Sequence, residues 1–277
     1  MSTVFVVTLI LFGFLQVVYS QENTTATPTD YCKSGLCHIL KKHIACRNKG
    51  ELAQQCPPDA QLVNLSGLHD LILDEHNGLR NVLAAGKVPN LPQPDRMATL
   101  QWHTELADLA TLNVKQCTLQ HDPCHNTQEF RNSGQNLALI NITKLEREGN
   151  HTDESLIKMS IGGWWNQSAN ITKEQLQRFP NGKLGDSFRN FAIMARDSNT
   201  FVGCAALRFD KPAGYPQFLL ACNYASNYIP EWPIYREKAI GCQSGSDSKY
   251  PSLCKAGEKY QEPPSEASTK VMSFWRL

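Results

Sequence analysis

The sequence predicts an α+β fold in which helices pack on a small sheet. Apolar residues recur at helical spacing in several segments after residue 66. Two strand-like segments, residues 201–209 and 216–224, are separated only by the turn-forming residues 210–215. Helical and strand segments alternate without the regular β-α-β spacing of a doubly wound sheet, and no internal repeat is visible. These observations favour helices layered on antiparallel strands.

Residues 4–18 are almost wholly apolar and are followed by Tyr19 and the small residue Ser20. Because this stretch is short for a membrane span, residues 1–20 are predicted to be a removed signal peptide, although the usual basic start is missing. An N-terminal anchor is the alternative. No later stretch predicts a transmembrane segment. Residues 21–31 are polar and Thr-rich, which is typical of disorder.

The ten cysteines are even in number, and with a signal peptide they predict a disulfide-bonded protein that is secreted and extracellular. Residues 32–60 carry four of them among little apolar material. This Cys-rich segment cannot bury a core of its own, so we expect disulfides to staple it to the main domain. An antiparallel hairpin would bring Cys204 to Cys222. The cysteines are Cys32, Cys37, Cys46, Cys56, Cys117, Cys124, Cys204, Cys222, Cys242 and Cys254.

Six Asn-x-Ser/Thr sequons also fit a secreted glycoprotein. Four of them fall within about thirty residues and predict an exposed, glycosylated face there. Chance occurrence is the alternative, and not every sequon need be used. The candidate glycosylation sites are Asn23, Asn64, Asn141, Asn150, Asn166 and Asn170.

Four helices are predicted. The first begins at Ser66, a residue type favoured at the N-cap, and ends at Gly86. The Pro-rich loop 87–100 leads to a second helix that ends at Cys117. The third covers residues 154–165 and the fourth residues 188–195.

His69 and His76 lie seven positions apart on the first helix and share a face. A metal or acid/base pair is one interpretation. No third ligand lies at a matching spacing, so we favour one surface histidine and one half-buried histidine held by a hydrogen bond.

The stretch from Cys117 to Ala138 is where a functional site is expected. His121 lies between two cysteines, and Gln135 and Asn136 open an apolar run. Dinucleotide, phosphate-loop, His-Glu-x-x-His, Gly-x-Ser-x-Gly and calcium-loop motifs are absent. The net charge of +1 gives no electrostatic case for binding nucleic acid or an anionic membrane.

Several motifs, in the correct order, resemble the CAP superfamily, whose SCP domain occurs in cysteine-rich secretory, antigen 5 and plant pathogenesis-related proteins. Residues 74–80 (DEHNGLR) resemble its HNxxR opening, and residues 100–110 (LQWHTELADLA) its LxWxxELAxxA helix. Residues 134–136 (GQN) lie where the family has GEN or, in insect antigen 5, GQN. Residues 201–205 (FVGCA) and 218–224 (FLLACNY) resemble its xVGCA and xxVCNY strands. The YCKSGLC start and the QCxxxHDxC run resemble insect venom allergen-like antigen 5 proteins.

The resemblance covers roughly residues 32–228 and implies an α-β-α sandwich. Residues 61–228 would be the CAP domain, and 229–277 a C-terminal extension with a small disulfide loop and a polar tail. The antigen 5 pattern implies four bridges, namely Cys32–Cys46, Cys37–Cys124, Cys56–Cys117 and Cys204–Cys222. Cys242 and Cys254 fall outside that pattern and are paired by elimination.

The family's central cleft carries a tetrad of two histidines and two acids that can hold zinc. Carried over by motif, its positions fall on His121, Gln135, Gln167 and Asn190. Three of the four lack an ionisable group, and no histidine follows His151. Asp122 could restore one carboxylate. Because neutral amides are poor ligands and cannot act as bases, we expect neither a metal site nor an active site, but a neutral hydrogen-bond network.

These features predict a monomeric, non-catalytic, secreted CAP protein without a cofactor, which binds an extracellular protein or a lipid ligand. A hydrolase or metal-dependent activity in the cleft is the first alternative. A sterol or lipid carrier is the second, with residues 177–186 as the nearest candidate loop. That loop is polar and offers only Phe179 and Leu184 as apolar contacts, whereas a lipid pocket needs a mostly apolar lining.

Overall fold

The computed structural model describes residues 28–142, 151–211, 215–237 and 241–260. The predicted signal peptide, the C-terminal tail after residue 260, and the sequons at Asn23 and Asn150 lie outside the described residues. Within the described ranges, no helix is both long and apolar enough to cross a membrane.

Within the described part of the chain, five strands form one sheet. The order β1 (Gln61–Leu62), β4 (Phe201–Lys211), β5 (Tyr215–Tyr224), β3 (Gly134–Asn141) is antiparallel throughout. The short β2 (Gln101–Trp102) pairs in parallel with β4. β3 places Gln135 opposite Asn223 of β5. This pairing places Gln135, a residue of the candidate site, at one end of the central strands.

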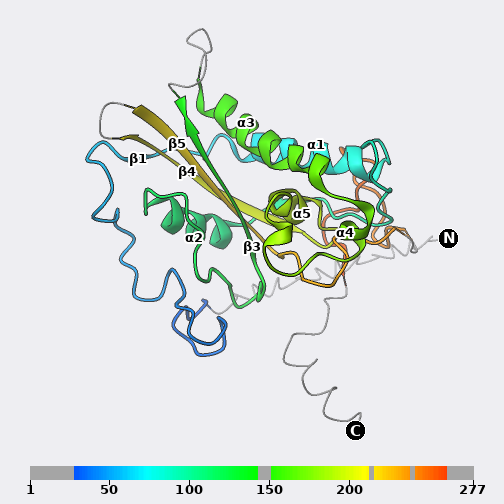
Figure 1. Ribbon diagram of the computed structural model, residues 1–277, viewed down its shortest axis with the longest axis horizontal. Coiled ribbons are helices and arrows are strands. Elements are labelled where there is room, and N and C mark those ends of the chain that lie inside the picture. Colours follow the sequence, from blue (N-terminus) through cyan, green and yellow to red (C-terminus); the bar gives the residue numbers. More distant parts are fainter. Residues whose placement is uncertain (1–27, 143–150, 212–214, 238–240, 261–277) are drawn as a thin grey trace, which may run out of the picture.

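Helices cover both faces of the sheet (Figure 1). α2 (Thr104–Val114) packs on β4 and β5 from one side. On the other side, α3 (Asp153–Asn166) and α5 (Arg189–Ala195) contact β3, and α1 (His69–Ala84) packs on both of these helices. The short α4 (Lys173–Gln177) and the 3₁₀ turns η2 (Gln167–Asn170) and η3 (Gly182–Gly185) connect α3 to α5. The α-β-α sandwich that the resemblance implied is confirmed.

The alternation of side chains along the central strands divides the core into two layers. Ala206, Phe218 and Leu220 face the larger core under α1, α3 and α5. Leu207 and Leu219 face the smaller core under α2. Successive strand residues point to opposite faces, so a run that is apolar at every position is buried from both sides.

The prediction that the first helix begins at Ser66 is wrong. α1 begins at His69, its N-cap is Leu68, and no side chain caps it. Asn64 Oδ1 instead accepts a hydrogen bond from Ser66 N at 3.0 Å, which holds Ser66 in a turn. The predicted end is correct: Gly86 has a φ of +69°, and Lys87 N donates to Val82 O across the helix end. The prediction that the second helix ends at Cys117 is wrong, because α2 ends at Val114 and Cys117 has a φ of +55°. The third helix is one residue longer than predicted at each end, and the fourth begins one residue later.

All ten cysteines are paired, in the connectivity that the resemblance implied plus Cys242–Cys254. Two bridges attach the Cys-rich segment to the loop after α2, through Cys37–Cys124 and Cys56–Cys117. Backbone and side-chain hydrogen bonds add to them, including Ile44 N to Cys124 O at 2.9 Å. The segment therefore lies along the α2 side of the sandwich (Figure 1).

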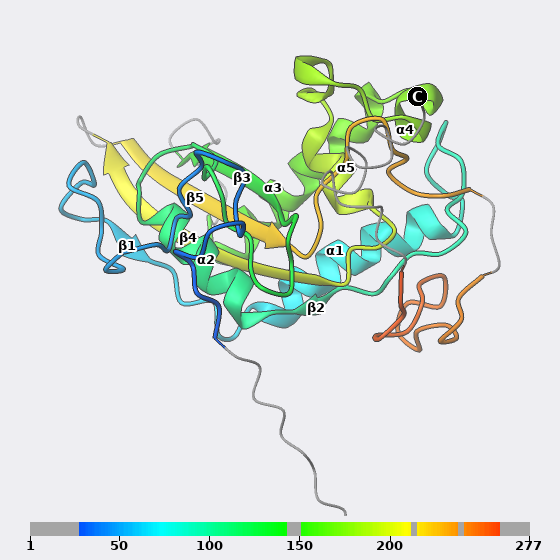
Figure 2. The ribbon, with the colours of Figure 1, turned by 90° about the horizontal axis from the view of Figure 1, so that it is seen from below.

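Residues 241–260 form a second attached segment, beside α1 (Figure 2). Cys254 is fully buried, and its backbone forms an isolated β-bridge with that of Ala98. Ser252 N donates to Asn81 Oδ1 at 2.9 Å, which ties the segment to α1. The carboxylate of Glu258 accepts hydrogen bonds from Gln243 N and Ser244 N and pairs with Arg96. This loop is therefore held by more than its own disulfide.

Candidate functional site

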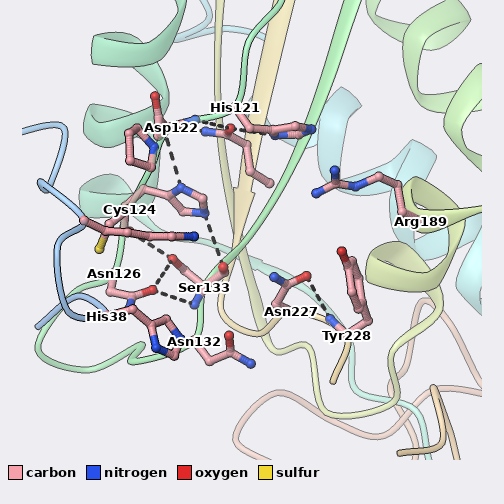
Figure 3. A pocket seen from close by; sticks show the side chains of 14 residues that line it. His38, His121, Asp122, Cys124, Asn126, Asn132, Ser133, Arg189, Asn227 and Tyr228 are labelled. Carbon is pink, nitrogen blue, oxygen red and sulfur yellow. Dashed lines mark hydrogen bonds and ion pairs between the residues drawn. The ribbon is translucent and has the colours of Figure 1, made fainter. Parts of the chain in front are cut away.

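A polar cavity of about 330 Å³ lies where the loop after α2 meets the start of β3 and the start of α5 (Figure 3). The loop supplies residues 121–126 and 132–133, and β3 supplies Gln135. Arg189 comes from α5, and Asn227 and Tyr228 follow β5. His38 and Lys41 of the Cys-rich segment complete the lining, because the Cys37–Cys124 bridge holds that segment against the loop.

His121, Gln135 and Asp122 form one hydrogen-bond network. Gln135 Nε2 donates to Asp122 Oδ2 at 2.7 Å and to Asn223 Oδ1 at 3.0 Å. Its Oε1 therefore accepts, from His121 Nδ1 at 2.9 Å and from Asp122 N at 3.3 Å. An amide oxygen can only accept, so Nδ1 of His121 carries a proton and Nε2 is left for the cavity.

Asp122 is buried, and amide donors occupy both of its oxygens. Asn113 Nδ2 donates to Oδ1 at 2.7 Å and Gln116 Nε2 at 3.1 Å, while Gln135 serves Oδ2. Burial raises the pKa of Asp122 to about 6, because desolvation outweighs the lowering effect of these hydrogen bonds. The carboxylate is therefore a fixed acceptor inside the wall of the cavity.

His125 is a further imidazole in the cavity that sequence reasoning missed. Its Nε2 donates to Ser133 O at 3.2 Å, and its Nδ1 lies 3.8 Å from Asp122 Oδ2. Burial, with the nearby His121, lowers the pKa of His125 to about 4, so the ring is neutral near pH 7. Burial and then Arg189 lower the pKa of His121 as well. The available signal was the position of His125 directly after Cys124.

The other two tetrad positions do not line the cavity. Gln167 Oε1 accepts from Asn190 N at 3.0 Å, and Asn190 O accepts from Asn136 Nδ2 at 3.1 Å. These bonds tie η2 to α5 and α5 to β3. Arg189, the residue before the fourth tetrad position, lines the cavity instead. Of the four motif positions, the structure brings together His121 and Gln135 at this cavity.

His69 and His76 have separate partners. His76 is fully buried, and its two nitrogens contact Ile72 O at 2.7 Å and the Tyr224 hydroxyl at 2.8 Å. Burial lowers the pKa of His76 to about 4. His69 stacks on Trp102 with ring centroids 3.8 Å apart. One buried and one stacked histidine agree with the structural interpretation of this pair, although His76 is more deeply buried than expected.

No cluster of three His, Cys, Asp or Glu side chains able to hold a metal ion occurs among the described residues. A second recess, of about 410 Å³, is more apolar and lies between α2, β4 and the segment before α1. Leu62, Val63, Leu65 and Trp102 contribute to its lining. In contrast, Phe179 of the predicted lipid loop is buried and stacks on Tyr228 with centroids 3.9 Å apart. Leu184 is that loop's exposed apolar side chain.

The sandwich, its disulfide framework and the motif-derived cleft together define a CAP protein. The model of the cysteine-rich secretory protein family, CAP, matches residues 73–224, and the chain belongs to this family. Its resemblance to antigen 5 is supported by curated relatives. Venom allergen-1 of Aedes aegypti is 32% identical over 83% of this chain and 89% of its own length. The antigen 5 like allergen Cul n 1 of Culicoides nubeculosus is 37% identical over 72% and 89%. Tabinhibitin 3 of Tabanus yao is 28% identical over 85% and 90%.

Solved structures show the same fold at low identity. The crystal structure of NaASP2 with Zn²⁺ has a TM-score of 0.56 and 17% identity, over 72% of this chain and 99% of its own. Hookworm platelet inhibitor has a TM-score of 0.51 and 16% identity, over 75% and 99%. At this level of identity the likeness extends to the architecture alone.

Proposed function

We propose that this protein acts outside the cell by binding, and that its CAP cleft has no catalytic role. One observation carries the proposal: Gln135 stands where the family has an acid, and its amide closes a hydrogen-bond network with His121 and Asp122. The amide cannot take a proton near pH 7 and is a poor metal ligand. The network therefore supports a preformed recognition surface.

A hydrolase in this cleft would need a base or a metal-bound water. Asp122 is the carboxylate in the lining, and its pKa of about 6 suits proton transfer. However, both of its oxygens already accept hydrogen bonds from amides. His121 keeps one free nitrogen but has no carboxylate hydrogen-bonded to its other nitrogen, so the base–orienter pair of a typical active site is missing.

Zinc titration of the oxidised protein near pH 7.5 tests this proposal. We expect no tight one-to-one binding by isothermal titration calorimetry. Gln135→Glu places a carboxylate beside His121 and Asp122 and should give measurable zinc binding that the parent lacks. Gln120→Glu, which adds the same charge at an exposed position, is the matched control. Tight binding by the parent protein that disappears in His121→Ala would contradict the proposal and favour a metal-dependent activity.

The proposed extracellular location is supported by the five disulfides and by the venom allergen relatives. Three sequon asparagines, Asn64, Asn166 and Asn170, are exposed and open to glycosylation. Asn141 lies in β3 and is half-buried. Deglycosylation followed by mass spectrometry of a secreted preparation would show which sites carry glycans.

A small apolar ligand remains a second candidate because of the recess beside α2. The aliphatic and indole part of its lining suits an apolar molecule better than residues 177–186 do, since Phe179 of that loop is packed into the core. Saturable binding of a sterol or fatty acid, with a change in Trp102 fluorescence, would support this function. In Trp102→Phe this fluorescence signal should be absent, while a direct measurement of bound ligand should still detect binding.

A further inference from the structure

Arg189 projects into the polar cavity without a partner of its own. Among the described residues, its buried Nε has no hydrogen-bond partner, while the side chain as a whole is half-buried. Its contact is with the Tyr228 ring, whose centroid lies 5.9 Å away. Figure 3 shows Arg189 and His121 facing each other across the cavity. A buried guanidinium donor without an acceptor is costly, which points to an acceptor supplied from outside.

The electrostatics of the cavity identify that acceptor. Lys41 and Arg189 are the two cationic side chains in the lining. The opposing carboxylate, Asp122, is engaged by three amides and cannot turn to Arg189 without breaking them. The unmatched charge is therefore positive. This arrangement is the reverse of a metal site.

We infer that the cavity binds a small oxyanion, phosphate or sulfate, with the Arg189 guanidinium as its principal donor. Arg189 can present two parallel N–H groups to two oxygens, which is the geometry that favours arginine over lysine at phosphates. Lys41 lines the same cavity and supplies a second cation. This inference rests on the proposed function, because it names the ligand chemistry of the same non-catalytic cleft. The oxyanion could be a free ion or the headgroup of a lipid.

The test is a titration of the oxidised, full-length mature protein with sodium phosphate at constant ionic strength, set by chloride. The ¹H–¹⁵N signal of the Arg189 side-chain Nε–H reports on the site directly. We expect saturable shifts of that signal, and about tenfold or greater loss of affinity in Arg189→Gln. Arg189→Lys keeps the charge but loses the pair of parallel N–H donors, and should bind phosphate with intermediate affinity. Lys183→Gln removes an exposed cation on η3, outside the cavity, and should bind like the parent.

Circular dichroism and thermal melting establish that each variant folds. Lys41→Gln provides an independent test from another segment of the chain, and we expect it to lose less phosphate affinity than Arg189→Gln. Vesicles containing phosphatidic acid, compared with phosphatidylcholine alone, distinguish the sources of the oxyanion. Vesicle binding that phosphate displaces identifies a lipid headgroup, whereas phosphate binding without vesicle binding identifies a free ion. Absence of saturable phosphate binding, or equal binding by Arg189→Gln, would overturn the inference. Zinc binding is measured separately, so failure of the proposed function is recognised on its own.

Discussion

The guanidinium of Arg80 joins three segments of the chain through backbone carbonyls. It is fully buried in α1 and donates to Ala98 O, Met194 O, Arg196 O, Asn199 O and Asp197 O at 2.6–3.4 Å. Burial lowers the pKa of Arg80 to about 10, so the group stays charged at neutral pH. Arginine in the HNxxR motif is therefore a structural residue here.

Arg80→Lys should lower the free energy of unfolding by about 3–5 kcal/mol, since one ammonium cannot satisfy carbonyls spread around a planar fork. Urea denaturation monitored by tryptophan fluorescence measures this. Arg131→Lys is the matched control, because Arg131 is exposed and bonds within its own turn to Gln128. A change of less than 1 kcal/mol in Arg80→Lys would show that water satisfies the carbonyls.

Glu258 predicts an acid-dependent loss of stability. Burial alone would raise its pKa, but hydrogen bonds from Ser244 and Gln243 and the contact with Arg96 outweigh it and hold the pKa near 2, below the ordinary 4.5. The stabilisation is thus present above pH 4.5 and is lost as the pH falls toward 2, about 3 kcal/mol in total. Glu258→Gln should differ from the parent near pH 6 and converge with it near pH 2 in chemical denaturation. Glu51→Gln, at an exposed site, should show no such convergence.

At the level of single residues, motif spacing was enough to find His121 and Gln135, because both lie within one recognisable stretch. Arg189 was missed since its role depends on α5 approaching the loop after α2, which no local pattern encodes. Asp122 was noticed only as a neighbour of His121. Its hydrogen-bond partners Asn113 and Gln116 depend on how the C-terminal end of α2 packs against the following loop.

Helix α2 approaches β4 most closely at Gly203. A Cβ there would lie 2.3 Å from Ala107 N and 2.4 Å from His103 O, both backbone atoms that cannot rotate away. Gly203→Ala should therefore force α2 outward and cost about 3 kcal/mol or more. Because α2 carries Asn113, the cavity should be disturbed as well. Gly163→Ala, where no atom outside the backbone of α3 itself lies within 4 Å of the new Cβ, should instead be neutral or stabilising. Thermal unfolding of the two variants, which should shift in opposite directions, measures both effects.

Among the elements, periodicity predicted α1, α2, α3 and α5 because each buries a regular apolar stripe. It gave no warning of β1 and β2, which are two residues long and exist only because β4 pairs with them. The five-residue α4 was also missed. Its signal was a capping box, in which the side chains of Thr172 and Gln175 each bond the other's backbone N–H.

The whole molecule is a sandwich with two attached segments that differ in how they are held. Cys37→Ser should cost more than Cys242→Ser, by about 1–2 kcal/mol from chain entropy, since the bridges close loops of 87 and 12 residues in sequence separation. The segment 241–260 also keeps its buried Leu253 and its contacts with Arg96 and Asn81. Chemical denaturation of both variants, with peptide mapping to verify the remaining bridges, gives the comparison. Equal losses would mean that the Cys-rich segment is held mainly by its hydrogen bonds.

The Cys37–Cys124 bridge helps to hold His38 and Lys41 at the cavity, so the complete lining of the proposed binding site depends on oxidative maturation. A chain made in a reducing cytosol could still assemble the sheet and its helices, yet its cavity would be open on the side that His38 and Lys41 line. Binding competence would then be acquired on passage through the secretory pathway, after the core has formed. Ligand binding, rather than secondary structure, would be the appropriate measure of whether a recombinant preparation has matured.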